Sequence, residues 1–110
     1  SDTESNIIDA LDYREKRVIF THEKWREKSS IHSELCDNTF LKNVRKTIEN
    51  PDIVWQDKSD KRRRCYYKKY STETYVKVVV WIKSDPCCVV TAFETNFIKE
   101  SQYAELIQIK

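Results

Sequence analysis

The stretch TYVKVVVWI at residues 74–82 constrains the fold of this chain more than any other part of its sequence. It is rich in β-branched and aromatic residues and lacks a helical period, so it predicts a strand, which we expect at the centre of a sheet. Side chains alternate between the two faces of a strand. The apolar set is Val76, Val78, Val80 and Ile82, and the mixed set is Tyr75, Lys77, Val79 and Trp81. The sequence therefore predicts one core face and one half-covered face on which a ligand can lie.

Weaker patterns on both sides of this stretch predict an α+β fold. Residues 7–11 are interpreted as a short apolar turn, and Thr21 is expected to cap a first helix. Asp37 or Asn38 is expected to cap a second, amphipathic helix. The expected helices cover residues 22–31 and about 38–48, and the other expected strands cover residues 14–20, 53–56, 64–70 and 87–93. The sum is an α+β fold with two N-terminal helices packed on a curved, mainly antiparallel sheet.

The end of the chain is ambiguous. Residues 103–109 alternate well enough to form an edge strand, which we favour, although Ala104, Glu105 and Leu106 also suit a helix.

Length and composition predict one domain over residues 1–110. The chain has no glycine, so turns that need a positive φ are expected to use Asn or Asp, or to be avoided through longer loops. No apolar run approaches the roughly 20 residues of a membrane span, and no membrane partner is expected. The chain begins at Ser1 and not at a methionine, so we interpret it as a fragment of a longer protein.

The sequence lacks the patterns that bind cofactors or metals. The four cysteines, at positions 36, 65, 87 and 88, have neither CxxC nor zinc-site spacing, and we expect them to be reduced structural thiols. Without glycine the chain cannot form a glycine-rich phosphate loop, and it contains no HExxH motif. No cofactor and no metal ion is therefore expected.

Positive charge is concentrated in the second half of the chain. Residues 1–60 hold 10 basic and 13 acidic side chains, whereas residues 61–110 hold 10 basic and 5 acidic ones. Residues 61–69 contain six basic residues interleaved with two tyrosines, a pattern typical of phosphate contact and base stacking. The other interpretation is an edge hairpin whose charges prevent aggregation. The neighbouring mixed face favours nucleic acid, and the expected RNA contacts are Arg62, Arg63, Arg64, Tyr66, Lys69, Lys77 and Trp81.

His32 is the main candidate for proton transfer. An imidazole exchanges protons near neutral pH, and Glu34, two residues later, is expected either to orient it or to share the proton transfer. A lone histidine near the end of a helix is more often a cap or a surface residue. His22, in the first turn of the expected helix, is interpreted as structural.

Several short motifs occur in an order that resembles a known superfamily. Trp25 is followed by His-Ser-Glu-Leu at residues 32–35, by Thr-Ile-Glu-Asn-Pro-Asp at 47–52, by the basic Tyr-Tyr-Lys strand and by Val-Thr-Ala-Phe at 90–93. Over roughly residues 14–99 this order resembles the phage-associated members of the barnase/EndoU/colicin/RelE-like nuclease superfamily. The resemblance implies a small metal-independent ribonuclease, often a toxin, attached to a larger phage or secreted protein.

The resemblance also implies site residues. His32 matches the histidine of a His-Pro-Glu-Leu run, with Ser33 in place of the proline. Tyr67 and Lys68 match a basic aromatic strand, and Thr91 matches the threonine of the strand that closes the site. Members often carry a second histidine two residues after the tryptophan, where this chain has Glu27. The implied catalytic set is His32, Glu27, Tyr67, Lys68 and Thr91.

Two functions are open at this point. The first is RNA cleavage in the cytoplasm, with transfer RNA as one possible target, by attack of the 2′-hydroxyl to give a 2′,3′-cyclic phosphate. Such a nuclease is expected to have an acidic immunity or antitoxin partner. The second is a non-catalytic RNA-binding or protein-interaction domain on the same fold, which the missing second histidine favours.

Overall fold

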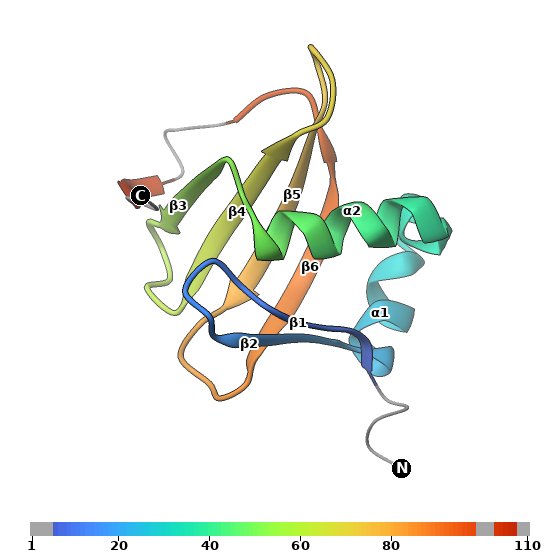
Figure 1. The fold of residues 1–110 in the computed structure, drawn as a ribbon, viewed down its shortest axis with the longest axis horizontal. Helices are drawn as coiled ribbons and strands as arrows, with labels where there is room; N and C mark the ends of the chain where they lie inside the picture. The colour runs from blue at the N-terminus through green and yellow to red at the C-terminus, as the bar shows by residue number, and fades with distance from the viewer. Residues whose placement is uncertain (1–5, 99–102, 108–110) are drawn as a thin grey trace.

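The computed structural model describes residues 6–98 and 103–107, which form a seven-stranded sheet with two α-helices and one short 3-10 helix (Figure 1). The strands lie in the order β1-β2-β6-β5-β4-β3-β7. The elements are β1 (Asn6–Leu11), β2 (Arg17–Thr21), α1 (His22–Ser29), η2 (Ser33–Cys36), α2 (Asn38–Glu49), β3 (Ile53–Asp57), β4 (Arg63–Lys69), β5 (Tyr75–Trp81), β6 (Cys87–Thr95) and β7 (Tyr103–Ile107). Within the described residues, no helix has the length and apolar character needed to cross a bilayer.

Strand β5 occupies the centre of the sheet, as its composition predicts. It pairs antiparallel with β4 along its whole length and antiparallel with β6 on its other side. Val76, Val78 and Val80 are at most 1% exposed and point into the main core. The opposite face of β5 is only partly covered, because Tyr75, Lys77 and Trp81 are half-buried. The expected division into a core face and a half-covered face is confirmed.

Helix α2 covers the core face of the sheet. The side chain of Asp37 accepts a hydrogen bond from the Thr39 N–H at 2.8 Å and so caps the helix, which ends before Pro51. Its buried residues recur at helical spacing, namely Phe40, Val44, Thr47 and Ile48. Figure 1 shows α2 lying across β4, β5 and β6, with the β1–β2 hairpin on the same side. The other face of the sheet, which carries no helix among the described residues, is called the open face below.

The N-terminal part of the chain corrects the sequence interpretation. Residues 6–11 form strand β1, paired antiparallel with β2, and not a short turn. The two helices therefore follow a hairpin and are not N-terminal. The hairpin turn contains Glu15 with φ of 64°, so an expected left-handed position at Asn or Asp is filled by a glutamate. Strand β2 joins the main sheet by a short parallel pairing with β6 at Val18–Cys87 and Ile19–Cys88.

Helix α1 and the 3-10 helix η2 cover the part of β6 that β2 leaves free. Thr21 caps helix α1, as expected, because its hydroxyl accepts a hydrogen bond from the Lys24 N–H at 3.2 Å. The helix begins at His22 and ends at Ser29, two residues earlier than predicted. Trp25 donates its indole N–H to the Leu35 carbonyl at 2.8 Å, which ties α1 to η2. This arrangement places the segment between them beside the edge of β6.

The C-terminal strand β7 lies at the edge of the sheet beside β3, as favoured from its alternation. Residues 108 and 109 of the expected strand lie outside the described residues. The four cysteines form no disulfide bond with one another.

Candidate nucleic-acid site on the open face

The open face carries a mixture of aromatic and basic side chains from five strands. Strand alternation and register bring Tyr67 opposite Lys77, and Lys77 opposite Phe93. A second cluster of buried side chains, separate from the main core, lies here and consists of Cys65, Tyr67, Val79 and Tyr103. Because this cluster covers only part of the face, space remains above it for a ligand.

A pocket of about 520 Å³ occupies that space. Its walls come from β3 and the following loop, from β4, β5 and β6, and from β7. They contain three cations and one carboxylate. The lining residues are Asp57, Lys58, Ser59, Arg63, Cys65, Lys77, Val79, Thr91, Phe93 and Tyr103. The balance of charge around the pocket favours an anionic ligand.

Lys77 lies among three aromatic rings at the base of this pocket. Its ammonium nitrogen is 5.4 Å from the centroid of the Phe93 ring, 5.8 Å from that of Tyr67 and 5.7 Å from that of Tyr103. These distances fall within the range of cation–π attraction. The rings therefore hold the ammonium group in place while its remaining surface faces the pocket.

Tyr67 and Tyr103 join β4 to β7 by a hydrogen bond between their hydroxyl groups. Burial raises the pKa of Tyr67 to about 12. Burial and the bond to Tyr67 raise the pKa of Tyr103 as well. Both phenols are therefore protonated at neutral pH, and in the bond between them one hydroxyl donates and the other accepts.

Three buried polar side-chain atoms have no hydrogen-bond partner within the described part of the chain, and all three belong to the open face. They are the Trp55 indole nitrogen, the Arg63 Nε and the Thr91 hydroxyl oxygen. Arg63 Nε lies 3.4 Å from a carboxylate oxygen of Asp60, which is an ion-pair distance without hydrogen-bond geometry. Tryptophan and arginine nitrogens only donate, and a hydroxyl can donate. Arg63 and Thr91 line the pocket and Trp55 does not, so a ligand rich in acceptor oxygens could satisfy the first two groups if they became accessible.

His32 reaches the edge of the same face. Its imidazole stacks on the ring of Phe93, which lines the pocket, with 4.7 Å between the ring centroids and 16° between the planes. The expected partner Glu34 does not orient it. The carboxylate of Glu34 instead accepts a hydrogen bond from the Glu94 backbone N–H at 3.1 Å. That bond fixes η2 against β6 and so holds His32 above Phe93.

Trp81 and Arg62 stand at one end of the open face. The guanidinium carbon of Arg62 lies 4.5 Å from the centroid of the Trp81 ring. Trp81 is the cross-strand partner of Arg63, which lines the pocket. The two expected contacts are therefore continuous with the pocket.

Three of the expected site residues lie on the core side of β4. Arg64, Tyr66 and Lys68 alternate with Arg63, Cys65 and Tyr67 along the strand. Lys68 contacts the Asn50 carbonyl at 3.0 Å and lies 3.8 Å from the Asp52 carboxylate. The structure does not bring these three side chains to the pocket.

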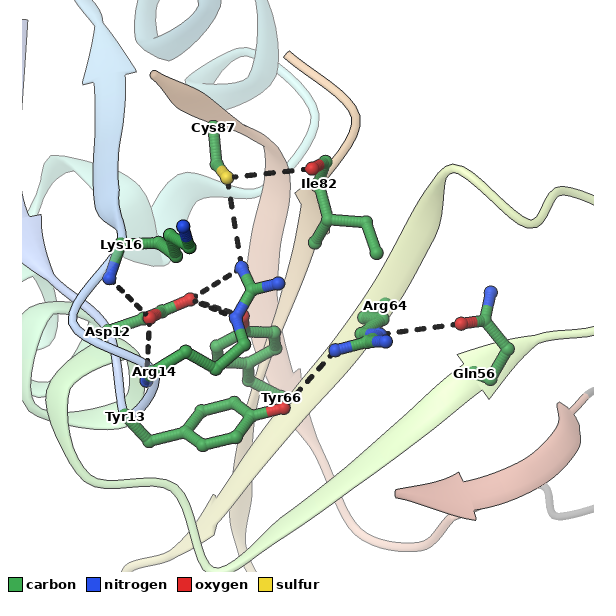
Figure 2. Close-up of polar contacts among 9 residues, drawn as sticks. All are labelled: Asp12, Tyr13, Arg14, Lys16, Gln56, Arg64, Tyr66, Ile82 and Cys87. Carbon is green, nitrogen blue, oxygen red and sulfur yellow. Dashed lines mark hydrogen bonds and ion pairs between the residues drawn. The ribbon is translucent and has the colours of Figure 1, made fainter. Parts of the chain in front are cut away.

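Figure 2 shows the network to which Arg64 and Tyr66 belong. The Tyr66 hydroxyl donates to the Asp12 carboxylate at 2.8 Å, and Arg14 donates to the same carboxylate at 2.7 and 3.0 Å (Figure 2). Arg64 contacts the Tyr13 hydroxyl and the Gln56 side-chain oxygen, both at 3.4 Å (Figure 2). This network fastens the β1–β2 turn to β4.

Two further expected residues lie apart from the pocket lining. The Glu27 side chain is 59% exposed on α1 and lies within ion-pair distance of Lys24 and Lys28. Lys69 is exposed at the end of β4, where its backbone N–H donates to Asp52.

Sequence reasoning missed Tyr103 and Phe93 as site residues. Tyr103 comes from the expected edge strand, but only the pairing of β7 with β3 brings its hydroxyl to Tyr67. Phe93 belongs to the Val-Thr-Ala-Phe motif, two residues after Thr91. Strand alternation within that motif was a signal that these two residues share a face.

The chain matches a known protein family. A family described as phage-Barnase-EndoU-ColicinE5/D-RelE like nuclease2 matches residues 5–108. The chain belongs to this family. No curated protein and no solved structure gives a significant match. Membership of this nuclease family confirms the resemblance seen in the motifs, and a nuclease of this type has nucleic acid as its substrate.

Proposed function

We propose that this nuclease-family domain is a metal-independent ribonuclease that leaves a 2′,3′-cyclic phosphate. The observation that carries the proposal is the set of unpartnered donors and cations around the open-face pocket, formed by Arg63, Lys77 and Thr91. Lys77 and the exposed part of the Arg63 guanidinium suit contact with the oxygens of a phosphodiester, whereas the Arg63 Nε and the Thr91 hydroxyl are buried in the free domain and would reach a phosphate oxygen only after local rearrangement. One carboxylate, Asp57, lines the pocket, whereas the metal sites of nucleases are built from several.

The reaction needs two proton transfers. A base removes the proton of the 2′-hydroxyl, the 2′-oxygen bonds to phosphorus, the bond from phosphorus to the 5′-oxygen breaks, and an acid protonates that oxygen. His32 is the base in this proposal, since a neutral imidazole accepts a proton near neutral pH. Tyr67 is assigned as the acid from its position, because it lies opposite Lys77 in the sheet and is protonated at neutral pH. Its side chain is 1% exposed, is bonded to Tyr103 and does not line the pocket, so this role requires the phenol to become accessible to the leaving oxygen.

The other residues that line the pocket are assigned roles in stabilising the transition state. Lys77 and Arg63 offset the charge that develops on the phosphorane, and Thr91 donates a hydrogen bond to it. Glu27 is a weaker candidate than Tyr67 for the second proton transfer, because its carboxylate is exposed and contacts two lysines on its own helix. Lys68 and Arg64 have no direct role in this scheme.

The biological setting forms part of the proposal. The excess of basic residues in residues 61–110 suits an acidic immunity or antitoxin protein that covers the open face in the cell that makes the domain. The domain would act on RNA, transfer RNA included, in the cytoplasm, after delivery as part of a larger phage or secreted protein.

The test is incubation of the domain with end-labelled transfer RNA and total RNA in EDTA between about pH 5 and 9. Discrete fragments that end in cyclic phosphate are expected. His32→Ala should slow their formation by about 10²–10⁴-fold. His22→Ala is the matched control, because it removes the other histidine, which contacts Trp25 on α1, and it should leave the rate unchanged. Intact RNA at every pH, or equal rates for His32→Ala and wild type, would refute the proposal.

A second candidate is an RNA-binding domain without catalysis. The raised pKa values of Tyr67 and Tyr103 favour it, since phenols that bind their protons tightly are weak bases and weak acids at neutral pH. RNA that shifts on a native gel in low salt and remains uncut would support this candidate.

A further inference from the structure

Arg62 is an exposed arginine with contacts on more than one side. Its guanidinium carbon lies over the Trp81 ring, 4.5 Å from the ring centroid. At the same time the Arg62 side chain is 58% exposed. Trp81 therefore covers one side of the guanidinium group, and more than half of the Arg62 side chain stays exposed.

Asp60 holds this guanidinium by its edge. One carboxylate oxygen accepts hydrogen bonds from the Arg62 backbone N–H and from its Nε, both at 3.0 Å, and the other accepts from Nη2 at 3.2 Å. The Arg62 carbonyl in turn accepts a hydrogen bond from the Ile82 N–H at 2.7 Å, next to Trp81. Hydrogen bonds from Arg62 lower the pKa of Asp60 to about 2, so the contact persists throughout the neutral range.

A guanidinium group that is held in place and stays exposed is a stacking surface. Arginine planes stack on unpaired RNA bases, and a lysine, which has the same charge but no plane, does not replace them. An arginine that is already held in place loses little conformational freedom on binding. A phosphate contact alone needs no such support, because a flexible cation supplies it.

We propose that Arg62, supported by Trp81 and held by Asp60, is a base-stacking subsite for an unpaired nucleobase of the RNA strand bound in the open-face pocket. This inference rests on the proposed function, because it assumes that the pocket takes the phosphodiester. Trp81 is four residues from Lys77 along β5, or about 13 Å. The stacked base therefore belongs to a different nucleotide from the one whose phosphate lies at Lys77.

The first experiment measures binding of an RNA that cannot be cleaved. The probe is a fluorescent single-stranded 2′-O-methyl oligonucleotide of about eight nucleotides, within the site sizes typical of single-strand binding. Arg62→Lys should weaken binding about tenfold. The slope of log affinity against log salt should stay the same, since the charge is kept. Arg45→Lys is the matched control, because Arg45 is an exposed arginine paired with Glu49 on α2, and it should bind like wild type.

The second experiment identifies the nucleotide whose base stacks on Arg62. Abasic nucleotides are introduced one position at a time into the same oligonucleotide. At one position the loss seen with wild type should vanish in Arg62→Lys, because both changes remove the same stack. Asp60→Asn should reduce the abasic loss at that position only in part, because it loosens the Arg62 guanidinium and leaves it present. Asp60 also lies 3.4 Å from the Arg63 Nε, so this variant is compared by its abasic profile and not by its overall affinity.

Three results would overturn the stacking subsite. They are wild-type affinity in Arg62→Lys, abasic losses that are equal in the two proteins at every position, and a wild-type domain that does not bind the oligonucleotide. The first two leave the ribonuclease proposal intact, since cleavage of unmodified RNA and its dependence on His32 are measured separately. Conversely, uncut RNA together with the expected Arg62→Lys effect would refute catalysis and keep the subsite.

Discussion

His32 and Phe93 stack nearly parallel, with 4.7 Å between their ring centroids, although they are 61 positions apart in the sequence. The contact joins the loop before η2 to the open face of β6. Phe93 also lines the pocket and lies within cation–π distance of Lys77. One ring therefore positions both the imidazole and the ammonium group.

Phe93→Leu should disturb the position of the His32 imidazole while the histidine itself is kept. A stacked aromatic pair contributes about 0.5–1.5 kcal/mol, so the rate of RNA cleavage should fall by up to about tenfold, less than for His32→Ala. The imidazole proton resonances of His32 should move downfield as the ring current of Phe93 is lost, which NMR can measure. Phe97→Leu, at an aromatic residue that is 57% exposed after β6, is the control. Unchanged His32 resonances would contradict the stacked geometry.

Thr91→Val should have effects of opposite sign on stability and on function. The Thr91 hydroxyl oxygen is buried and has no partner among residues 6–98 and 103–107. Its replacement by a methyl group should raise the free energy of unfolding by about 1 kcal/mol, measured in urea, and should slow RNA cleavage.

The matched variant is Thr47→Val. The Thr47 hydroxyl donates to the Asn43 carbonyl within α2 at 2.7 Å and is fully buried. This variant should lower the free energy of unfolding by about 1 kcal/mol and leave the rate of cleavage unchanged. A Thr91→Val protein that loses as much stability as Thr47→Val would show that the Thr91 hydroxyl is satisfied in the free domain.

Asp12→Ala should destabilise the fold far more than Asp9→Ala. The Asp12 side chain is fully buried and binds Arg14, Tyr66 and two backbone N–H groups, so its removal leaves buried donors without partners (Figure 2). We expect a loss of about 3 kcal/mol in the free energy of unfolding. Asp9 also pairs with an arginine, Arg17, but its side chain is 46% exposed, and its loss should cost less than about 1 kcal/mol. Urea denaturation of both variants measures the difference.

Acid should weaken the fold through the same carboxylate. Burial acts to raise the pKa of Asp12, but the hydrogen bonds from Arg14, Tyr66 and the backbone outweigh it, and the pKa lies below its usual 3.8. A lowered pKa in the folded state stabilises the fold above about pH 4, and this contribution is lost as the pH falls through the lowered value. Wild type should therefore lose more stability than Asp12→Asn between about pH 5 and 2 in urea titrations. Parallel losses in the two proteins would contradict this assignment.

Alkaline pH should lower the stability of the fold by ionising the buried tyrosines. Burial raises the pKa of Tyr67 from 10.0 to about 12, so its contribution to stability is complete below pH 10 and is lost as the pH rises towards 12. Tyr67→Phe should make the stability curve flatter in that range. Some slope should remain, because the pKa values of Tyr66 and Tyr103 are raised as well. A Tyr67→Phe curve that matches wild type would show that the phenol is not buried.

The features that sequence predicts well are those that depend on neighbours along the chain. The central strand, the cap at Asp37 and the buried positions of α2 follow from local period and local hydrogen bonding. Thr91, Lys77 and Tyr67 were named from the sequence and do lie on one face. Their roles in catalysis stay predictions.

The features that sequence missed depend on pairing between distant segments. Residues 6–11 have little strand character of their own and form β1 because they pair with β2. Lys68 and Arg64 looked equivalent to their neighbours in the basic run, but alternation along β4 sends them to the core side. Tyr103 meets Tyr67 only because β7 returns to β3, across a separation that no local pattern records.

Strand β7 has two roles: it supplies one wall of the pocket, and it protects the edge of the sheet from pairing with other chains. Tyr103 is one wall of the pocket, and its strand also covers the backbone edge of β3, which contains Ile53 and Trp55. If β7 detached, β3 would present unpaired backbone groups and apolar side chains, which is a template for pairing with another chain. A copy that loses β7 would then lose its binding site and become prone to aggregation in the same step, so incomplete copies would tend to be removed from solution.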